Sequence, residues 1–179
     1  KRLVEEKSDG RIAVELYLNA EMGGSDEENV NLLLQGNVEM AAFLNATLRQ
    51  VSGVAGFDLL ELPYVFNSAD EVFEIAEGPF GQELNNQLRE ATGTQVMGFF
   101  TNGELAVLSN DSILKTPADM KGKNLRTANT AIWLETTKAM GANPTPVTYS
   151  EVYTSLQQGT IDGLVTSLSL FAQDHFYEV

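Results

Sequence analysis

Arg126 is the side chain whose type and position most clearly indicate ligand chemistry. It ends a short stretch, residues 123–126, that we expect to form a β-strand. A guanidinium group presents a planar fork of N–H donors that matches the two oxygens of a carboxylate, and it stays charged at any relevant pH. Because ligands of α/β proteins gather at the carboxyl ends of strands, Arg126 is predicted to bind a carboxylate. The alternative is a surface arginine that pairs with one of the 25 acidic residues.

Two more polar side chains are predicted to follow strands. Asn45 comes after an apolar run at residues 40–43, and Thr166 comes after the strand expected at residues 161–165. An amide and a hydroxyl can each donate to or accept from a ligand, so both are candidate ligand-binding residues. Asn45 is equally consistent with an ordinary turn residue.

Trp133, the only tryptophan, is expected on the helix that follows Arg126. Its ring could form a wall of a small-ligand cleft or fill the core side of that helix. Glu104 and Asn102 lie at an Asn-Gly turn signal. A carboxylate at Glu104 would favour a ligand that carries a positive nitrogen as well as a carboxylate, whereas a solvated or salt-bridged Glu104 would have no such role. Asn102 could satisfy further polar atoms of the ligand.

The residues that usually carry catalysis or bind metals are scarce. His175 is the only histidine and cysteine is absent, which removes most support for a Ser-His-Asp triad, a thiol nucleophile or an imidazole metal site. Acidic neighbours such as Glu5 and Glu6 point apart on a helix and therefore indicate a solvated face. The glycine pairs at residues 53–56 and 78–81 lack the P-loop lysine and the dinucleotide-binding spacing. We expect no catalytic residue, no metal site and no cofactor.

Composition narrows the class of protein further. The 179 residues are 43% hydrophobic and 20% charged, which is typical of a globular chain. Eleven basic against 25 acidic residues give a net charge of -14, which repels nucleic acid and anionic membrane surfaces. No apolar run is long enough to span a bilayer. The lack of cysteine is compatible with the periplasm and equally with the cytosol.

Helix and strand signals alternate along the chain, as expected for an α/β fold. Residues 1–8 are predicted to end a helix that is closed by Asp9 and Gly10. Helix starts are indicated by a repeated capping pattern, which pairs Ser25 with Glu28, Ser68 with Glu71, Thr116 with Asp119 and Thr148 with Glu151. Strands are expected at residues 11–17, 38–43, 95–100, 104–109, 123–126 and 161–165. The chain is predicted to cross from one part of the fold to another near residues 99–103.

Several motifs occur in an order that resembles one known family. They are Asp9-Gly10-Arg11, Gly23-Gly24, residues 62–66 (Leu-Pro-Tyr-Val-Phe), residues 118–122 (Ala-Asp-Met-Lys-Gly) followed by Arg126, residues 141–146 (Gly-Ala-Asn-Pro-Thr-Pro), and residues 151–159 followed by Asp162-Gly163. This order and spacing resemble the substrate-binding receptors of tripartite ATP-independent periplasmic (TRAP) transporters, of the dicarboxylate-binding type. The similarity covers essentially the whole chain.

The resemblance implies a two-lobe α/β fold of the periplasmic binding protein type, with both lobes incomplete in this chain. Residues 1–102 would form part of lobe one, and residues 103–179 would form part of lobe two and the start of the return to lobe one. In that family a strand delivers one arginine to the ligand's carboxylate, and Arg126 stands at that position. Thr166 stands where the family has a ligand-contacting asparagine.

The chain differs from the family at two places. Receptors of this family often carry a second arginine in the strand just after the crossing between lobes, yet no arginine occurs between Glu90 and Leu125. Where many members have Glu-Asn-Pro after Asp-Gly, this chain has Val-Thr-Ser at residues 165–167. The acids that this family usually binds therefore do not carry over to this chain as its ligands on the resemblance alone.

The function implied by the resemblance is that of an extracytoplasmic solute receptor without enzymatic activity. It would capture a small organic acid, or a zwitterion that bears a carboxylate, between the two lobes by hinge closure. In the periplasm it would deliver this ligand to a membrane permease. Two other classes stay open, namely the ligand-sensing domain of a regulator and an enzyme on the same scaffold.

Overall fold

A four-stranded sheet lies in the second half of the chain. The structure, a computed structural model, describes residues 1–18 and 21–179. The strands are β1 (Leu105–Ser109), β2 (Asn124–Thr127), β3 (Asn143–Pro146) and β4 (Gly163–Ser167), in the spatial order β1-β4-β2-β3. β2 runs parallel to β3 and to β4, whereas β1 runs antiparallel to β4. This order places β2, the strand that carries Arg126, inside the sheet.

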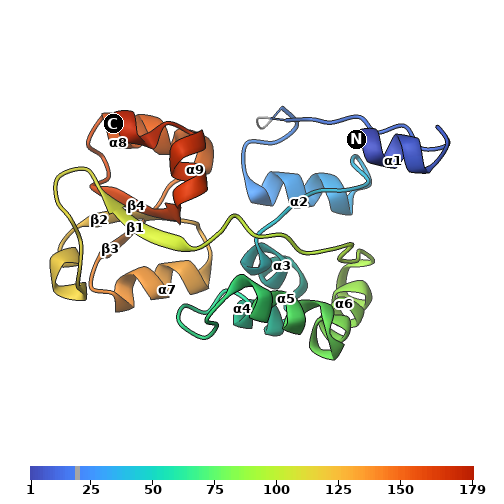
Figure 1. Cartoon of the computed structure of the whole chain (residues 1–179), viewed down its shortest axis with the longest axis horizontal. Coiled ribbons are helices and arrows are strands. Elements are labelled where there is room, and N and C mark those ends of the chain that lie inside the picture. Colours follow the sequence, from blue (N-terminus) through green and yellow to red (C-terminus); the bar gives the residue numbers. More distant parts are fainter. Residues whose placement is uncertain (19–20) are drawn as a thin grey trace.

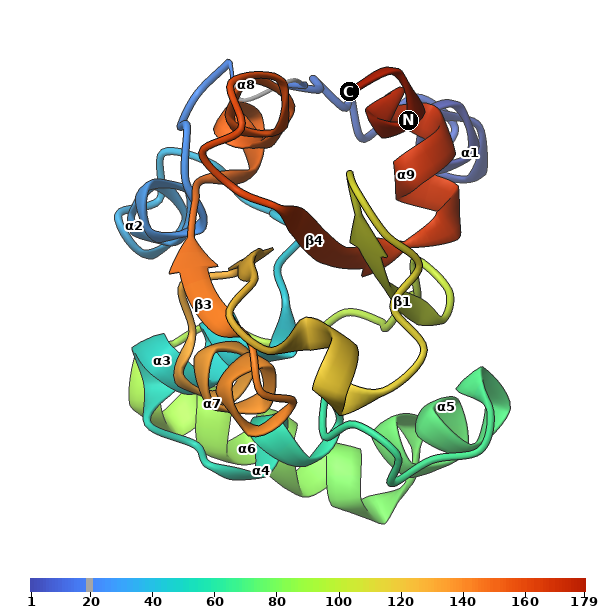
Figure 2. The same ribbon diagram turned by 90° about the vertical axis from the view of Figure 1, so that its left-hand side faces the viewer.

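Helices cover both faces of this sheet (Figures 1 and 2). α7 (Ala131–Ala139) lies on one face, and α8 (Val152–Gln157) and α9 (Leu168–Gln173) lie on the other. Short 3-10 turns complete this region, namely η1 (Pro117–Met120), η2 (Tyr149–Glu151) and η3 (Phe176–Glu178). The buried side chains that hold α8 and η3 on the sheet are Val152, Leu156, Ile161, Leu164 and Phe176, which we call the sheet core.

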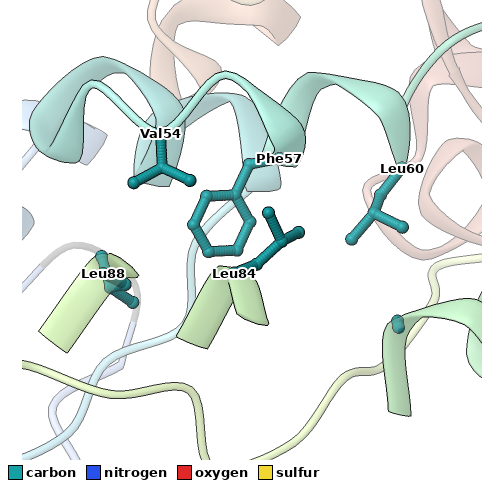
Figure 3. Packing of buried hydrophobic residues seen from close by; sticks show 6 residues of the cluster. Val54, Phe57, Leu60, Leu84 and Leu88 are labelled. Carbon is teal, nitrogen blue, oxygen red and sulfur yellow. The ribbon is translucent and has the colours of Figure 1, made fainter. Parts of the chain in front are cut away.

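The first half of the chain is helical wherever it has regular structure within its described residues. Its helices are α1 (Arg2–Lys7), α2 (Asp26–Leu34), α3 (Asn45–Ser52), α4 (Gly56–Leu59), α5 (Ala69–Glu77) and α6 (Pro79–Thr92). Figure 3 shows how Phe57, which is fully buried, points between the side chains of α6. The buried residues of this cluster are Val54, Phe57, Leu60, Ala76, Leu84 and Leu88, which we call the helical core.

Three predicted strands are wrong. Residues 11–17, 38–43 and 95–100 are not strands in the structure. Several of their apolar side chains are exposed to solvent, including Met40 and Met97, each with 73% of its surface exposed. An alternating pattern indicates an extended backbone, but a strand also needs a neighbouring strand to hydrogen-bond with. Within the described residues these segments have no such neighbour.

The predicted strands of the second half are close to the observed ones. Residues 104–109 contain β1, and residues 123–126 overlap β2, which begins and ends one residue later. The strand expected at residues 161–165 is β4, shifted by two residues, so Thr166 lies inside the strand and not after it. The shift arises because residues up to Asp162 form a turn. The carbonyl of Asp162 accepts the N–H of Asn110, and the pairing of β4 with β1 begins only at Gly163.

Three of the four predicted capping pairs form as hydrogen bonds. Ser25 and Thr116 each take part in a capping box, and Ser68 Oγ accepts the N–H of Glu71. Thr148 makes no side-chain cap, so that prediction is wrong. The predicted end of the first helix is confirmed, because Asp9 and Gly10 follow α1 with φ of 51° and 73°.

Extended chain at residues 94–104 connects the helical half to the sheet (Figure 1). Gly103 has φ of 99°, a backbone conformation that favours glycine, and the turn there directs the chain into β1. In the part of the chain that the structure describes, no helix is both long and apolar enough to cross a membrane.

Candidate ligand-binding site

Arg126 is a buried cation on an interior strand. Only 9% of its surface is exposed, and in the sheet it lies opposite Thr145 of β3 and Leu164 of β4. Its Nε donates a hydrogen bond of 3.0 Å to the carbonyl of Val147, which fixes the plane of the guanidinium. Among the described residues no carboxylate forms an ion pair with it, and none accepts a hydrogen bond from its terminal nitrogens. A buried charge without a paired charge is costly, so this group is suited to bind an anion.

Tyr149 holds the guanidinium from one side. The centroid of its ring lies 5.4 Å from Arg126 Cζ, a geometry in which a cation is attracted to the face of an aromatic ring. The Tyr149 hydroxyl donates a hydrogen bond to the carboxylate of Asp174. Burial first, and then this hydrogen bond to Asp174, raise the pKa of Tyr149, so the phenol stays neutral and keeps its O–H on the Asp174 carboxylate.

Asp26, the first residue of α2, brings a negative charge from the helical half towards Arg126. Burial lowers the pKa of Arg126, and the charges of Tyr149 and Asp26 act in the opposite direction, so the guanidinium remains protonated. The carboxylate of Asp26 is held by Thr47 of α3, whose Oγ1 donates to Oδ2 at 3.2 Å. The carboxylate of Asp26, from the helical half, therefore interacts electrostatically with the guanidinium of Arg126, from the sheet.

Unsatisfied polar groups surround the end of β2. The hydroxyls of Thr127 and Thr130 are buried and have no hydrogen-bond partner among the described residues. Thr130 is also the N-cap of α7, and its side chain caps no N–H of the helix. The first N–H groups of a helix lack partners within the helix and favour anions. Together with Arg126, this end of the strand presents positive and donor groups for which a carboxylate is a suitable partner.

The Asp-Gly pair at residues 162 and 163 fixes the position of β2. Asp162 Oδ2 accepts the N–H of Asn124 at 2.7 Å, two residues before Arg126. A Cβ atom on Gly163 would lie 2.0 Å from the carbonyl oxygen of Leu108, so only glycine allows β4 to approach β1 this closely. The Asp-Gly motif therefore stands at the start of β4, beside the strand that carries Arg126, for a physical reason.

Two of the predicted site residues lie in elements other than those expected. Asn45 does not follow a strand but is the first residue of α3, and it is half-buried. Thr166 lies within β4, opposite Ala106 of β1, with 5% of its surface exposed. The strand-end interpretation of both residues is wrong because the first lacks a strand and the second strand extends two residues further than predicted.

The two candidates near the crossing are on the surface. Asn102 is exposed, and its backbone carbonyl accepts a hydrogen bond from Ser169 Oγ of α9. Glu104 is exposed as well, and its side chain makes no hydrogen bond or ion pair with a described residue. No contact of the described residues joins either side chain to Arg126.

Trp133 makes a contact that the sequence did not reveal. Its Nε1 donates a hydrogen bond of 2.8 Å to Oε2 of Glu61, which follows α4 in the helical half. Glu61 Oε1 accepts the N–H of Ala46, at the start of α3, at 3.0 Å. The one local signal for such an acceptor is that the N-cap of α3 is Leu44, which has no polar side chain to cap the helix.

The described surface has shallow hollows, but Arg126 does not line them. One lies between α2 and the segment before it, and the other lies beside α8. Their lining residues include Glu21, Gly24 and Gln35 for the first, and Thr148, Thr154 and Gln158 for the second. In the described part of the chain no group of three or more His, Cys, Asp or Glu side chains is arranged to hold a metal.

The whole chain matches a protein family. Residues 1–179 match the family described as "Bacterial extracellular solute-binding protein, family 7" (DctP). The chain belongs to this family. A solute-binding protein of Roseobacter denitrificans is 34% identical to this family 7 member over 172 residues, which are 96% of this chain and 51% of the relative. The chain thus spans about half the length of the curated relatives that it matches.

Solved structures are similar to this family 7 member in fold. A TRAP periplasmic solute binding protein from Roseobacter denitrificans with bound L-galactonate is 32% identical, with a TM-score of 0.89 over 99% of this chain and 58% of that chain. Another, from Sulfurospirillum deleyianum with bound succinate, is 29% identical, with a TM-score of 0.90 over 99% of this chain and 56% of that chain. The resemblance to TRAP receptors and the α/β fold of the two-lobe periplasmic binding protein type are confirmed.

Proposed function

We propose that this family 7 member is a periplasmic receptor that captures a small organic acid, or a zwitterion that bears a carboxylate, and delivers it to a membrane permease. Residues 1–102 belong to lobe one, and residues 103–179 belong to lobe two and the start of the return to lobe one. The ligand lies between them, and its negative charge pairs with the guanidinium of Arg126. The single observation that supports this most is the burial of Arg126 without a described carboxylate partner.

The geometry suggests how an acid is bound. Val147 and Tyr149 fix the guanidinium of Arg126, so its terminal N–H groups bind both oxygens of a carboxylate. The hydroxyl of Thr130 and the first N–H groups of α7 take the remaining lone pairs. Asp26, on the opposite side, accepts from hydroxyl groups or from an ammonium group of the ligand, which suits a hydroxy acid or a zwitterion better than a neutral, apolar molecule.

The remaining candidates complete the site on closure. Asn45 and Thr166 supply an amide and a hydroxyl, Trp133 forms part of the wall, and Asn102 and Glu104 approach from the crossing. Closure is a hinge movement that ligand contacts to both lobes favour. The protein has no catalytic turnover of its own, which the transport role of the family supports.

Calorimetric titration of the intact protein tests this proposal. The panel contains L-galactonate, succinate, an amino acid and a neutral hexose, and we expect an acid to bind best. Arg126→Ala leaves the carboxylate unpaired in a closed site, so affinity should fall by about 30-fold or more, or roughly 2–5 kcal/mol. Arg126→Lys keeps the charge but loses the fork, and it should give a smaller loss. Arg89→Ala, which removes an exposed arginine of α6, is the control and should bind normally.

Two results would contradict the proposal. The first is tightest binding to the neutral hexose, and the second is unchanged affinity of the Arg126→Ala protein for the acids. Circular dichroism of each variant verifies that the fold is retained, so that a loss of binding is not a loss of structure.

A further inference from the structure

Few hydrogen bonds join the two halves of the molecule. Among the described residues, side-chain hydrogen bonds between residues 1–102 and residues 104–179 run from Ser169 to the carbonyl of Asn102, and from Trp133 to Glu61. The first lies at the crossing itself, one residue before Gly103. The second joins residues that are 72 positions apart and lies where the segment after α4 extends towards α7 (Figure 1). It is therefore the contact that can report how the halves sit relative to each other.

Each oxygen of the Glu61 carboxylate accepts a hydrogen bond from a different half of the molecule. Oε1 accepts the N–H of Ala46 at 3.0 Å and so caps α3 in place of Leu44, whose side chain cannot. Oε2 accepts the indole N–H of Trp133 at 2.8 Å. The preceding residue, Leu60, belongs to the helical core, which fixes the backbone of Glu61 in that half. Of the two Glu61 hydrogen bonds, the Oε2 bond alone has to break if the halves separate.

The same carboxylate adjoins both sides of the candidate binding site. α3 begins at Asn45, and its residue Thr47 holds Asp26, the acidic group that acts on Arg126. Trp133 lies on α7, the helix whose N-terminus adjoins Arg126 along the chain. A change in the Glu61 contact therefore changes the separation between the Asp26 side and the Arg126 side of the site.

We propose that Glu61 is a positioning residue whose hydrogen bond to Trp133 Nε1 holds the two sides of the binding site together and breaks when the halves separate. This inference rests on the proposed function, because it assigns to Glu61 the regulation of the same site. Separation exposes both Oε2 and the indole N–H to water, which satisfies them, so the contact is reversible.

A carboxylate is required because both of its oxygens must accept. A glutamine has one acceptor oxygen and one N–H₂ donor, so it can serve the N–H groups of α3 or the indole of Trp133, but not both. Glu61→Gln therefore keeps the size of the side chain and the cap of α3 and loses the bond to Trp133. Trp133→Phe removes the same bond from the other side and keeps an aromatic ring.

The first experiment needs no ligand. Trp133 is the only tryptophan of residues 1–179, so these residues give one indole N–H resonance. Because residues 1–179 contain no cysteine, Asn86→Cys and Lys121→Cys place spin labels on exposed positions of the two halves. We expect Glu61→Gln to shift the indole resonance, to speed its hydrogen exchange, and to lengthen or broaden the distance between the labels. Glu77→Gln, an exposed position on α5, is the matched control and should change none of them.

The second experiment measures affinity for L-galactonate and succinate by calorimetry. Glu61→Gln and Trp133→Phe should each weaken binding by about three- to tenfold, which is the range expected for one lost hydrogen bond. The double variant should be no weaker than the worse single variant, because both remove the same bond. Purely structural damage would instead lower thermal stability in step with affinity and would add in the double variant.

The outcomes separate this inference from the proposed function. If the wild type binds none of the acids, the proposed function is wrong, and the label distances and the indole resonance alone then decide whether Glu61 sets the separation of the halves. If the wild type binds an acid, but Glu61→Gln leaves affinity, label distance and indole resonance unchanged, the role of Glu61 is overturned. Additive losses in the double variant would overturn it as well.

Discussion

Residues 1–102 and residues 103–179 carry similar strand signals, but among the described residues strands form and pair only in the second region. Residues 95–100 and 104–109 are both apolar and lie on either side of the same turn. The second becomes β1 and pairs with β4, whereas the first stays unpaired, with Phe100 66% exposed. An alternating pattern thus indicates an extended backbone, and a strand forms only where a partner strand is present.

Substitutions in the helical core and in the sheet core test most directly whether the two regions differ in this way. Phe57→Ala removes a fully buried ring from the helical core, and such changes cost about 3–5 kcal/mol of the free energy of unfolding. If the regions are stabilised separately, hydrogen exchange should speed up in α6 and stay slow in β2 and β4. Leu164→Ala, in the sheet core, should have the reverse effect. Equal loss of protection in both regions for either variant would show that they unfold as one unit.

A smaller loss of stability is expected from a substitution that disturbs the close approach of β1 and β4. A methyl group on Gly163 would lie 2.0 Å from the carbonyl oxygen of Leu108, so Gly163→Ala must force β1 away from β4. Overpacking of this kind costs about 1–3 kcal/mol, which chemical denaturation can measure. Gly98→Ala is the control, because a Cβ there would have nothing within 4 Å. A stability loss as large for Gly98 as for Gly163 would mean that the unpaired segment is as tightly packed as the sheet.

Much of the sheet region could be predicted from the sequence because its signals are local. Capping by Thr116, the turn at Gly103 and the short apolar runs each act within a few residues of chain. Arg126 could be predicted as a ligand candidate for the same reason, since its strand and its side chain suffice. The partner strand that residues 11–17 and 38–43 would need has no local signal.

The rest of the site could not be predicted because its contacts join distant positions. Tyr149 stacks on Arg126 from 23 positions away, and Trp133 reaches Glu61 across 72 positions. Glu104 and Asn102, chosen for their place in the chain, are instead exposed at the crossing. Side-chain type and spacing identify which groups can bind a carboxylate, and three-dimensional packing alone decides which of them meet.

The contribution of Glu61 to the free energy of unfolding should also depend on pH. Burial raises the pKa of Glu61 above its ordinary value of 4.5, hydrogen bonds from Ala46, Trp133 and Asn45 oppose this shift, and the charge of Asp58 adds to it. Because the folded protein binds this proton more tightly than the unfolded chain, Glu61 contributes stability that is fully present below pH 4.5 and is lost as the pH rises through the raised pKa.

The free energy of unfolding of the wild type, measured relative to Glu61→Gln, should therefore increase as the pH falls from neutral towards 4.5. Taking this difference cancels the titration of the other acidic groups. Glu77→Gln serves as the control for the loss of an exposed carboxylate. A difference that stays flat, or that decreases in acid, would show that burial does not dominate at Glu61.

The smallest effect is expected in the unpaired segments. Met97 lies in a predicted strand but has 73% of its surface exposed, so Met97→Ser in a protein of residues 1–179 should change the free energy of unfolding by no more than about 0.5 kcal/mol. Leu164→Ser, in a paired strand with 2% exposure, should cost several times more, because it removes buried apolar surface and adds a buried hydroxyl. Chemical denaturation of both variants provides the measurement. Comparable losses at the two positions would mean that residues 95–100 pack against another segment of the protein in solution. The pattern in the first region would then produce a strand after all.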